Sequence, residues 1–174
     1  MKYKLTIPFF FIFLGFKTSI YDLQIQTIEG NNIKMSEYKD KKILIASVSP
    51  DNLQAGVVTF LDSLQAAHPA VVVIAVPARD FGGSRNTEIL LDIKNNTARK
   101  FIVTASADVR KDKAQSPIMN WLTHDSENPH FGADVDTDNQ IYIISESGIL
   151  YAVLEKGVPI DVIDQLLKQE DVKQ

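Results

Sequence analysis

Cysteine is absent from this 174-residue chain. That absence excludes disulfides, zinc-thiolate sites, iron-sulfur clusters and every reaction that needs a thiolate nucleophile. Clusters of basic residues are also missing, since the formal net charge is −4, the pI is about 5.3 and the lysines and arginines are scattered. A nucleic acid is therefore not an expected partner, because the chain has no basic face to follow phosphates.

Motifs for metal, nucleotide or acyl-transfer chemistry are equally scarce. His68, His124 and His130 are too far apart in the sequence to suggest a metal site, and the last two lie in a polar segment where surface exposure is expected. The sequence shows no arrangement for a catalytic triad, no glycine-rich phosphate loop and no metalloprotease helix. We therefore expect no cofactor.

Length and composition predict one folded domain. Hydrophobic residues make up 45% and charged residues 23% of the chain, which is ordinary for a globular protein. The chain is long enough for one full-sized core and too short for two, and no repeat or low-complexity linker interrupts it. We expect a single domain over residues 19–174.

The first 18 residues have the pattern of a signal peptide or N-terminal anchor. Lys2 and Lys4 form a short positive segment, residues 5–16 are almost entirely apolar, and small polar residues follow. The apolar run is too short to span a bilayer comfortably, because a transmembrane helix needs about 20 residues. We expect export to the periplasm or the extracellular side, with loose membrane association if the segment is retained. A buried first strand or helix is the alternative.

Hydrophobic periodicity predicts alternating strands and helices. We expect a hairpin over residues 23–35, buried strands at 43–48 and 71–76, a helix at 86–95, a short strand at 101–104, a short helix at 116–123 with Trp121 in the core, and a strand pair at 141–145 and 149–153. The strand-helix-strand order implies parallel strands with a right-handed crossover. The whole order suits a central mixed sheet with helices on both faces.

Two helix boundaries carry specific expectations. Pro50 suits the first turn of a helix that ends near His68, and we expect Ser49, Asp51 or Asn52 to cap that helix. The last helix is expected to start at Pro159. Its buried side should consist of Ile160, Ile163, Leu166 and Leu167.

Several segments, taken in order, resemble the glutathione peroxidase family. Residues 77–83 are similar to the family's Pro-Cys-Asn-Gln-Phe-Gly-Gly motif, which is the most specific match. Residues 116–122 resemble its His-Pro-Leu-Tyr-x-Trp-Leu segment, residues 43–49 resemble the strand before its catalytic loop, and residues 19–39 resemble its first hairpin. The resemblance implies a thioredoxin-like, glutathione peroxidase-type three-layer α/β sandwich.

The resemblance also indicates that the catalytic residues of the family have been lost. The family's catalytic Cys or selenocysteine falls on Asn52, its Gln falls on Asp80, and its Trp-Asn pair falls on Thr137 and Asp138. All four catalytic positions are therefore replaced. The cleft beside them would be lined by Asp51, Phe81, Gly82 and Gly83.

The favoured interpretation is an exported binding or interaction module, without peroxidase activity, whose partner is an unidentified protein or small molecule. One alternative is an enzyme of altered chemistry or a cation-binding protein that uses the acidic cleft. Asp134, Asp136 and Asp138 resemble the start of a calcium loop, but Ser145 occupies the position where such loops end in Glu. The other alternative is a peroxidase of the oxidative stress response that works through an unrecognised residue.

Overall fold

The computed structural model describes residues 18–52, 55–82, 86–96 and 98–170. The predicted export signal therefore lies outside the described residues, apart from Thr18. Among the helices of the described ranges, none combines the length and the apolar character needed to cross a membrane.

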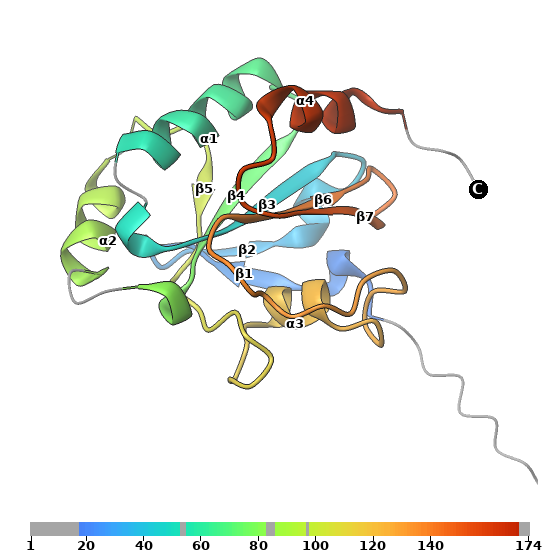
Figure 1. The fold of residues 1–174 in the computed structure, drawn as a ribbon, viewed down its shortest axis with the longest axis horizontal. Coiled ribbons are helices and arrows are strands. Elements are labelled where there is room, and N and C mark those ends of the chain that lie inside the picture. Colours follow the sequence, from blue (N-terminus) through green and yellow to red (C-terminus); the bar gives the residue numbers. More distant parts are fainter. Residues whose placement is uncertain (1–17, 53–54, 83–85, 97, 171–174) are drawn as a thin grey trace, which may run out of the picture.

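A five-stranded mixed sheet forms the middle layer of the molecule (Figure 1). Its strands are β3 (Ile43–Val48), β4 (Val72–Pro77), β5 (Ile102–Val103), β6 (Gln140–Ile144) and β7 (Leu150–Leu154). They lie in the order β5-β4-β3-β6-β7; β3, β4 and β5 are parallel, while β6 and β7 are antiparallel to their neighbours. All six residues of β3 are buried, because this central strand is covered on both faces.

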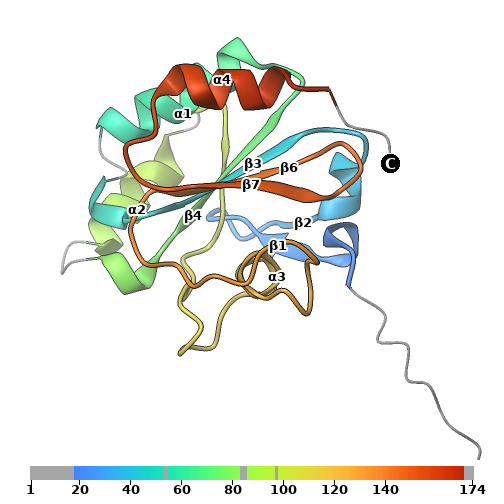
Figure 2. The ribbon, with the colours of Figure 1, turned by 45° about the vertical axis from the view of Figure 1, so that its right-hand side comes forward.

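Helices cover both faces of the sheet (Figure 2). One face packs against α1 (Ala55–Ala67), α2 (Asn86–Asn95) and α4 (Ile160–Lys168). The other packs against α3 (Pro117–Thr123) and the antiparallel hairpin of β1 (Gln24–Gln26) and β2 (Asn32–Lys34). The predicted three-layer α/β architecture is therefore confirmed.

Alternate residues of β3 belong to the two halves of the core, one on each face of the sheet. Ile43 and Ile45 pack on the side of α3 and the hairpin, whereas Leu44 and Val48 pack on the side of α1 and α4. Trp121 lies in the first half, as predicted, and is 3% exposed. Its Nε1 donates a hydrogen bond of 2.8 Å to the Thr18 carbonyl oxygen, so the beginning of the described chain is fixed to α3.

Two helix boundaries differ from the sequence-based expectation. The residues Pro50–Asn52 form a separate turn of 3-10 helix, η3, and α1 begins at Ala55, because the chain must leave the sheet before a helix can pack back across it. Ile160, expected on the buried side of α4, is 49% exposed. It occupies the first position of the helix, directly after an exposed loop, whereas Ile163 and Leu167 are buried as predicted.

A buried lysine binds the C-terminal end of the last helix, α4. Lys42 is 5% exposed, and its Nζ donates hydrogen bonds to the carbonyl oxygens of Leu167, at 3.1 Å, and Gln169. The same Nζ lies 3.6 Å from a carboxylate oxygen of Glu146, in the turn between β6 and β7. A cation at the C-terminal end of a helix is favourable, so Lys42 holds the end of α4 to the sheet.

Candidate functional site

The segments that are predicted to carry the family's catalytic positions meet at one end of the sheet. In the parallel pair of β3 and β4, Val48 lies opposite Pro77, and in the antiparallel pair of β3 and β6, Ser47 lies opposite Gln140. The turns after β3 and β4 therefore lie at the same end as the loop before β6. In chain order, these three segments contain Asn52, Asp80, Thr137 and Asp138.

A buried hydroxyl group joins the first two of these turns. Ser49 is 4% exposed, and its Oγ donates a hydrogen bond of 2.7 Å to the carbonyl oxygen of Phe81. This bond fixes η4 (Arg79–Phe81) against the end of β3. Phe81 is half-buried against the core and Gly82 follows as the C-cap of η4, while Gly83 lies outside the described residues.

Asp80 shapes the loop that follows β5. Its Oδ2 accepts hydrogen bonds from the backbone N–H groups of Val109, at 2.6 Å, and Arg110, at 3.4 Å. Beside it, the Nε of Arg79 donates a 2.9 Å hydrogen bond to Asp108, which lowers the pKa of that carboxyl group. The carboxylate of Asp80, at the position predicted to match the family's Gln, therefore accepts hydrogen bonds from backbone donors of its own fold.

The hydrogen-bond partners of Asp138 lie on the other side of β3 from those of Asp80. The Oδ1 of Asp138 accepts a 2.9 Å hydrogen bond from Lys156, after β7, and its Oδ2 accepts one of 3.3 Å from the side chain of Asn139. Thr137, next to it, is exposed. Because β5 and β7 are the two edges of the sheet, Asp80 and Asp138 share an end of the sheet but bond to partners at opposite edges.

The three aspartates of the proposed calcium loop do not gather around a common point. The Oδ1 of Asp134 accepts hydrogen bonds from the backbone N–H groups of Lys111 and Val135, at 2.9 and 2.8 Å, and Asp136 is exposed. Within the described ranges, no three His, Cys, Asp or Glu side chains are placed to hold a metal ion. The geometry therefore does not favour the cation-binding alternative.

The histidines are likewise separate. His68 and Asp164 form a 2.7 Å contact between Nε2 and Oδ1 that links the end of α1 to α4. His124 is half-buried at the C-cap of α3, with its Nδ1 3.0 Å from the Asn120 carbonyl oxygen. Surface exposure is therefore correct for His130 and only partly correct for His124.

One buried polar group was not predicted from the sequence. Tyr142 lies on β6 and is 1% exposed, and no hydrogen-bond partner reaches its hydroxyl group among the described residues. Burial raises the pKa of Tyr142, and the charges of Asp134 and Asp136 raise it further, so the phenol stays protonated at neutral pH. The apolar run around Tyr142 predicted burial, but it carried no signal that the charges of Asp134 and Asp136, in the loop just before β6, would raise the pKa of this phenol.

Comparison with known proteins identifies the relatives of this fold and site. No family model matches the chain. A probable glutathione peroxidase 8 of Arabidopsis thaliana is 26% identical over 136 residues, covering 75% of this chain and 80% of the relative. This chain is glutathione peroxidase-like. The resemblance to that family, which was predicted from the sequence, is confirmed.

Solved structures confirm the thioredoxin-like fold of this glutathione peroxidase-like protein. The apo form of Trgpx matches with a TM-score of 0.62 at 17% identity, covering 86% of this chain and 93% of that structure. T. cruzi GPX1 matches with a TM-score of 0.57 at 18% identity, covering 86% and 94%. The exposed lipoprotein thioredoxin Etrx1 of Streptococcus pneumoniae matches with a TM-score of 0.59 at 15% identity, covering 84% and 98%.

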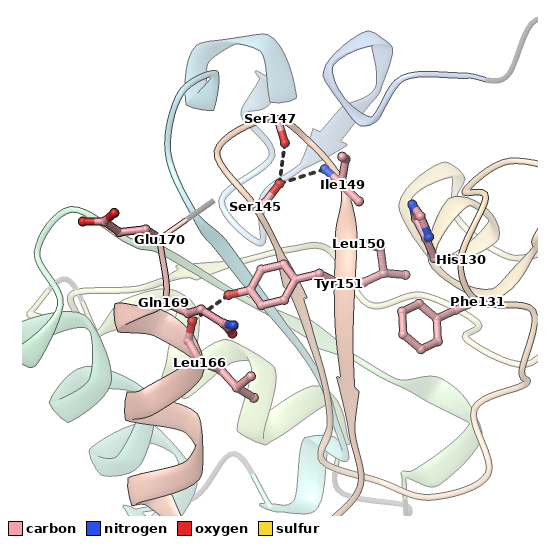
Figure 3. Close-up of a pocket in the computed structure, with 10 residues that line it drawn as sticks. All are labelled: His130, Phe131, Ser145, Ser147, Ile149, Leu150, Tyr151, Leu166, Gln169 and Glu170. Carbon is pink, nitrogen blue, oxygen red and sulfur yellow. Dashed lines mark hydrogen bonds between the residues drawn. The ribbon is translucent and has the colours of Figure 1, made fainter. Parts of the chain in front are cut away.

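A wide cavity of this glutathione peroxidase-like protein lies away from the family's catalytic positions. It has a volume of about 510 Å³. Tyr151 and Leu166 lie on one side, joined by a 2.8 Å hydrogen bond from the Tyr151 hydroxyl group to the Leu166 carbonyl oxygen, and His130 and Phe131 lie on the other (Figure 3). The cavity is next to the turn that ends β6, whereas the catalytic positions lie near the start of β6.

Proposed function

We propose that this glutathione peroxidase-like chain is a catalytically inactive member of its group and acts as an exported binding or interaction module. The absence of cysteine from all 174 residues is the observation that carries the proposal. The partner is a protein or a small molecule, and the net charge of −4 argues against nucleic acid.

The reaction of the family depends on the missing sulfur. A thiolate near the start of a helix is stabilised by the free N–H groups and the helix dipole. It attacks the peroxide oxygen, which breaks the O–O bond and leaves a sulfenic acid that a reductant must recycle. The amide of Asn52 is not an ionisable nucleophile, and methionine oxidation would need a separate reductase. No group in the chain replaces the thiolate in this cycle.

Export is supported by the pattern of the first 18 residues. The segment combines Lys2 and Lys4 with an apolar run of signal-peptide length. One of the structural neighbours is named as an exposed lipoprotein, so a protein with this fold can function outside the cytoplasm. Fusion of residues 1–18 to a reporter without its own signal is expected to carry it into the envelope or the medium. Retention of the reporter in the cytoplasm would contradict this part of the proposal.

The inactivity is tested by a peroxide assay on the purified protein. With hydrogen peroxide and either glutathione or thioredoxin, we expect the rate of peroxide loss to equal the rate without protein. Asn52→Cys restores a thiol at the family's position, and Ser126→Cys places one at an exposed loop position as a matched control. Comparing the two shows whether the turn before α1 still activates sulfur. Sustained turnover by the unmodified chain would overturn the proposal.

A further inference from the structure

The folded domain depends on residues at the very end of the segment predicted to direct export. The carbonyl oxygen of Thr18 accepts the 2.8 Å hydrogen bond from the indole of Trp121, which is 3% exposed. Ser19 caps a turn of 3-10 helix, η1 (Ile20–Asp22), through both its side chain and its backbone N–H group. The first residue of that turn is fully buried in the core. A chain cut after Thr18 or Ser19 would therefore lose contacts that hold its own beginning in place.

The same stretch lacks the pattern that a signal peptidase recognises. Such an enzyme cuts after a small residue that has a second small residue two positions before it. The small residues among positions 1–26 are Thr6, Gly15, Thr18 and Ser19, and no two of them are separated by a single residue. Lys17 occupies the position where a cut before Thr18 would need a small side chain. The sequence therefore does not favour removal of the segment.

The composition of the segment suits retention in a membrane. Residues 5–16 are almost entirely Leu, Ile and Phe, with Lys4 before them and Lys17 directly after them. Lysine side chains can extend their ammonium groups from a short apolar segment to the membrane surface, which compensates for the limited length of the run. The larger positive charge, with Lys2 and the α-amino group, lies at the N-terminal end, and the more positive end stays on the cytoplasmic side.

We propose that residues 5–16 are kept in the exported protein and anchor it to a lipid membrane, with the α3 side of the domain facing the lipid. The inference rests on the proposed export. Only Lys17 separates the apolar run from Thr18, so Phe16 lies at most about 7 Å from the residue that Trp121 binds. The described chain begins on the α3 side of the sheet, whereas α1 and α4 cover the opposite side (Figures 1 and 2).

Expression of the full chain in a bacterial host tests the retention. We expect the protein in the membrane fraction, from which detergent releases it, with an intact mass that includes residues 5–16. Lys17→Ala supplies a small residue two positions after Gly15, which permits a cut before Thr18. We expect this variant to lose its membrane association, to begin at Thr18 and to keep its melting temperature, because the Thr18 carbonyl group remains. Lys17→Gln removes the same charge without supplying a small residue and should stay anchored.

A fluorescent label tests which side of the domain faces the lipid. Because the chain has no cysteine, a thiol-reactive label attaches only at Ser126→Cys or, in a second variant, at Ala66→Cys; both positions are exposed. Ser126 lies in the loop that Asn128 joins to Trp121, and Ala66 lies in α1. On phosphatidylcholine vesicles that contain nitroxide lipids, the label at Ser126→Cys should be quenched several-fold more strongly. Equal quenching of the two labels would overturn the assigned side.

The outcomes separate this inference from the proposed function. A soluble chain outside the cytoplasm, whether shortened or of full length, would overturn the anchor and leave the exported module intact. A chain that stays in the cytoplasm would contradict export and the anchor together. Sustained peroxide turnover would contradict the lack of catalysis and leave the anchor unaffected.

Discussion

Gly148→Ala is expected to destabilise the protein by about 3 kcal/mol. Gly148 forms the tight turn between β6 and β7 with a φ of 82°, a conformation that costs other residues about 1–2 kcal/mol. A Cβ at this position would also lie 2.6 Å from the ring of Tyr21. That ring is held in place, because its hydroxyl group donates a 2.8 Å hydrogen bond to the Glu146 carbonyl oxygen. For a chain of this size the loss lowers the melting temperature by about 6–12 °C.

A matched variant separates the two causes of this loss. Gly30 also has a positive φ, of 94°, but a Cβ there would meet no atom within 4 Å. Gly30→Ala should therefore show only the backbone cost of about 1–2 kcal/mol. In a Tyr21→Ala background, Gly148→Ala should likewise fall to that smaller value, as a double-mutant cycle would reveal. An equal loss from Gly148→Ala with and without the Tyr21 ring would show that the contact is not responsible.

Asn128→Ala is expected to lower the free energy of unfolding by about 3 kcal/mol. Asn128 is fully buried and joins α3 to the loop after it. Its Nδ2 donates to the carbonyl oxygens of Trp121, His124 and Phe131, at 2.5, 3.1 and 3.1 Å. Its Oδ1 accepts from the backbone N–H groups of His130 and Phe131, at 3.2 and 2.8 Å. Alanine removes the side-chain partner from all of these backbone groups. The His124 carbonyl oxygen keeps the N–H groups of Glu127 and Asn128, but each buried group that is left unpaired is unfavourable by about 1–3 kcal/mol.

Urea unfolding measures this loss, and hydrogen exchange locates it. The amides of His130 and Phe131 should exchange much faster in Asn128→Ala, since they lose the acceptor that protects them. Asn31→Ala serves as the control, because Asn31 is exposed and surface substitutions usually change stability by less than about 0.5 kcal/mol. Similar unfolding midpoints for both variants would show that the Asn128 bonds contribute little.

The layered fold was predictable because its strands and helices differ in hydrophobic period. The largely apolar run of residues 43–48 favoured a strand covered on both faces, and the structure buries all six of these residues. Periodicity fails at element ends, where a residue can be in phase with the buried face and yet lie beyond the core. Ile160 illustrates this failure, and the separate turn at Pro50 is a second case, because a proline suits several kinds of helical turn.

The candidate site was predictable only in part. Short motifs and strand order indicated which segments meet at one end of the sheet, and β-sheet register places them there. The partners of the side chains depend on contacts between residues far apart in the chain, which no local pattern encodes. Asp80 and Asp138 illustrate the limit, since the sequence suggested one shared acidic cleft and the structure gives them donors at opposite edges.

The turn between β6 and β7 is the place where the two ends of the domain are secured. Tyr21 reaches it from the beginning, and Lys42 connects it to the carbonyl groups that end α4. Each of these contacts joins residues 125 positions apart. Contacts between residues so far apart in the chain form slowly during folding, because a long loop must close first. During synthesis, the contacts between Lys42 and the end of α4 therefore cannot form until this last helix has left the ribosome.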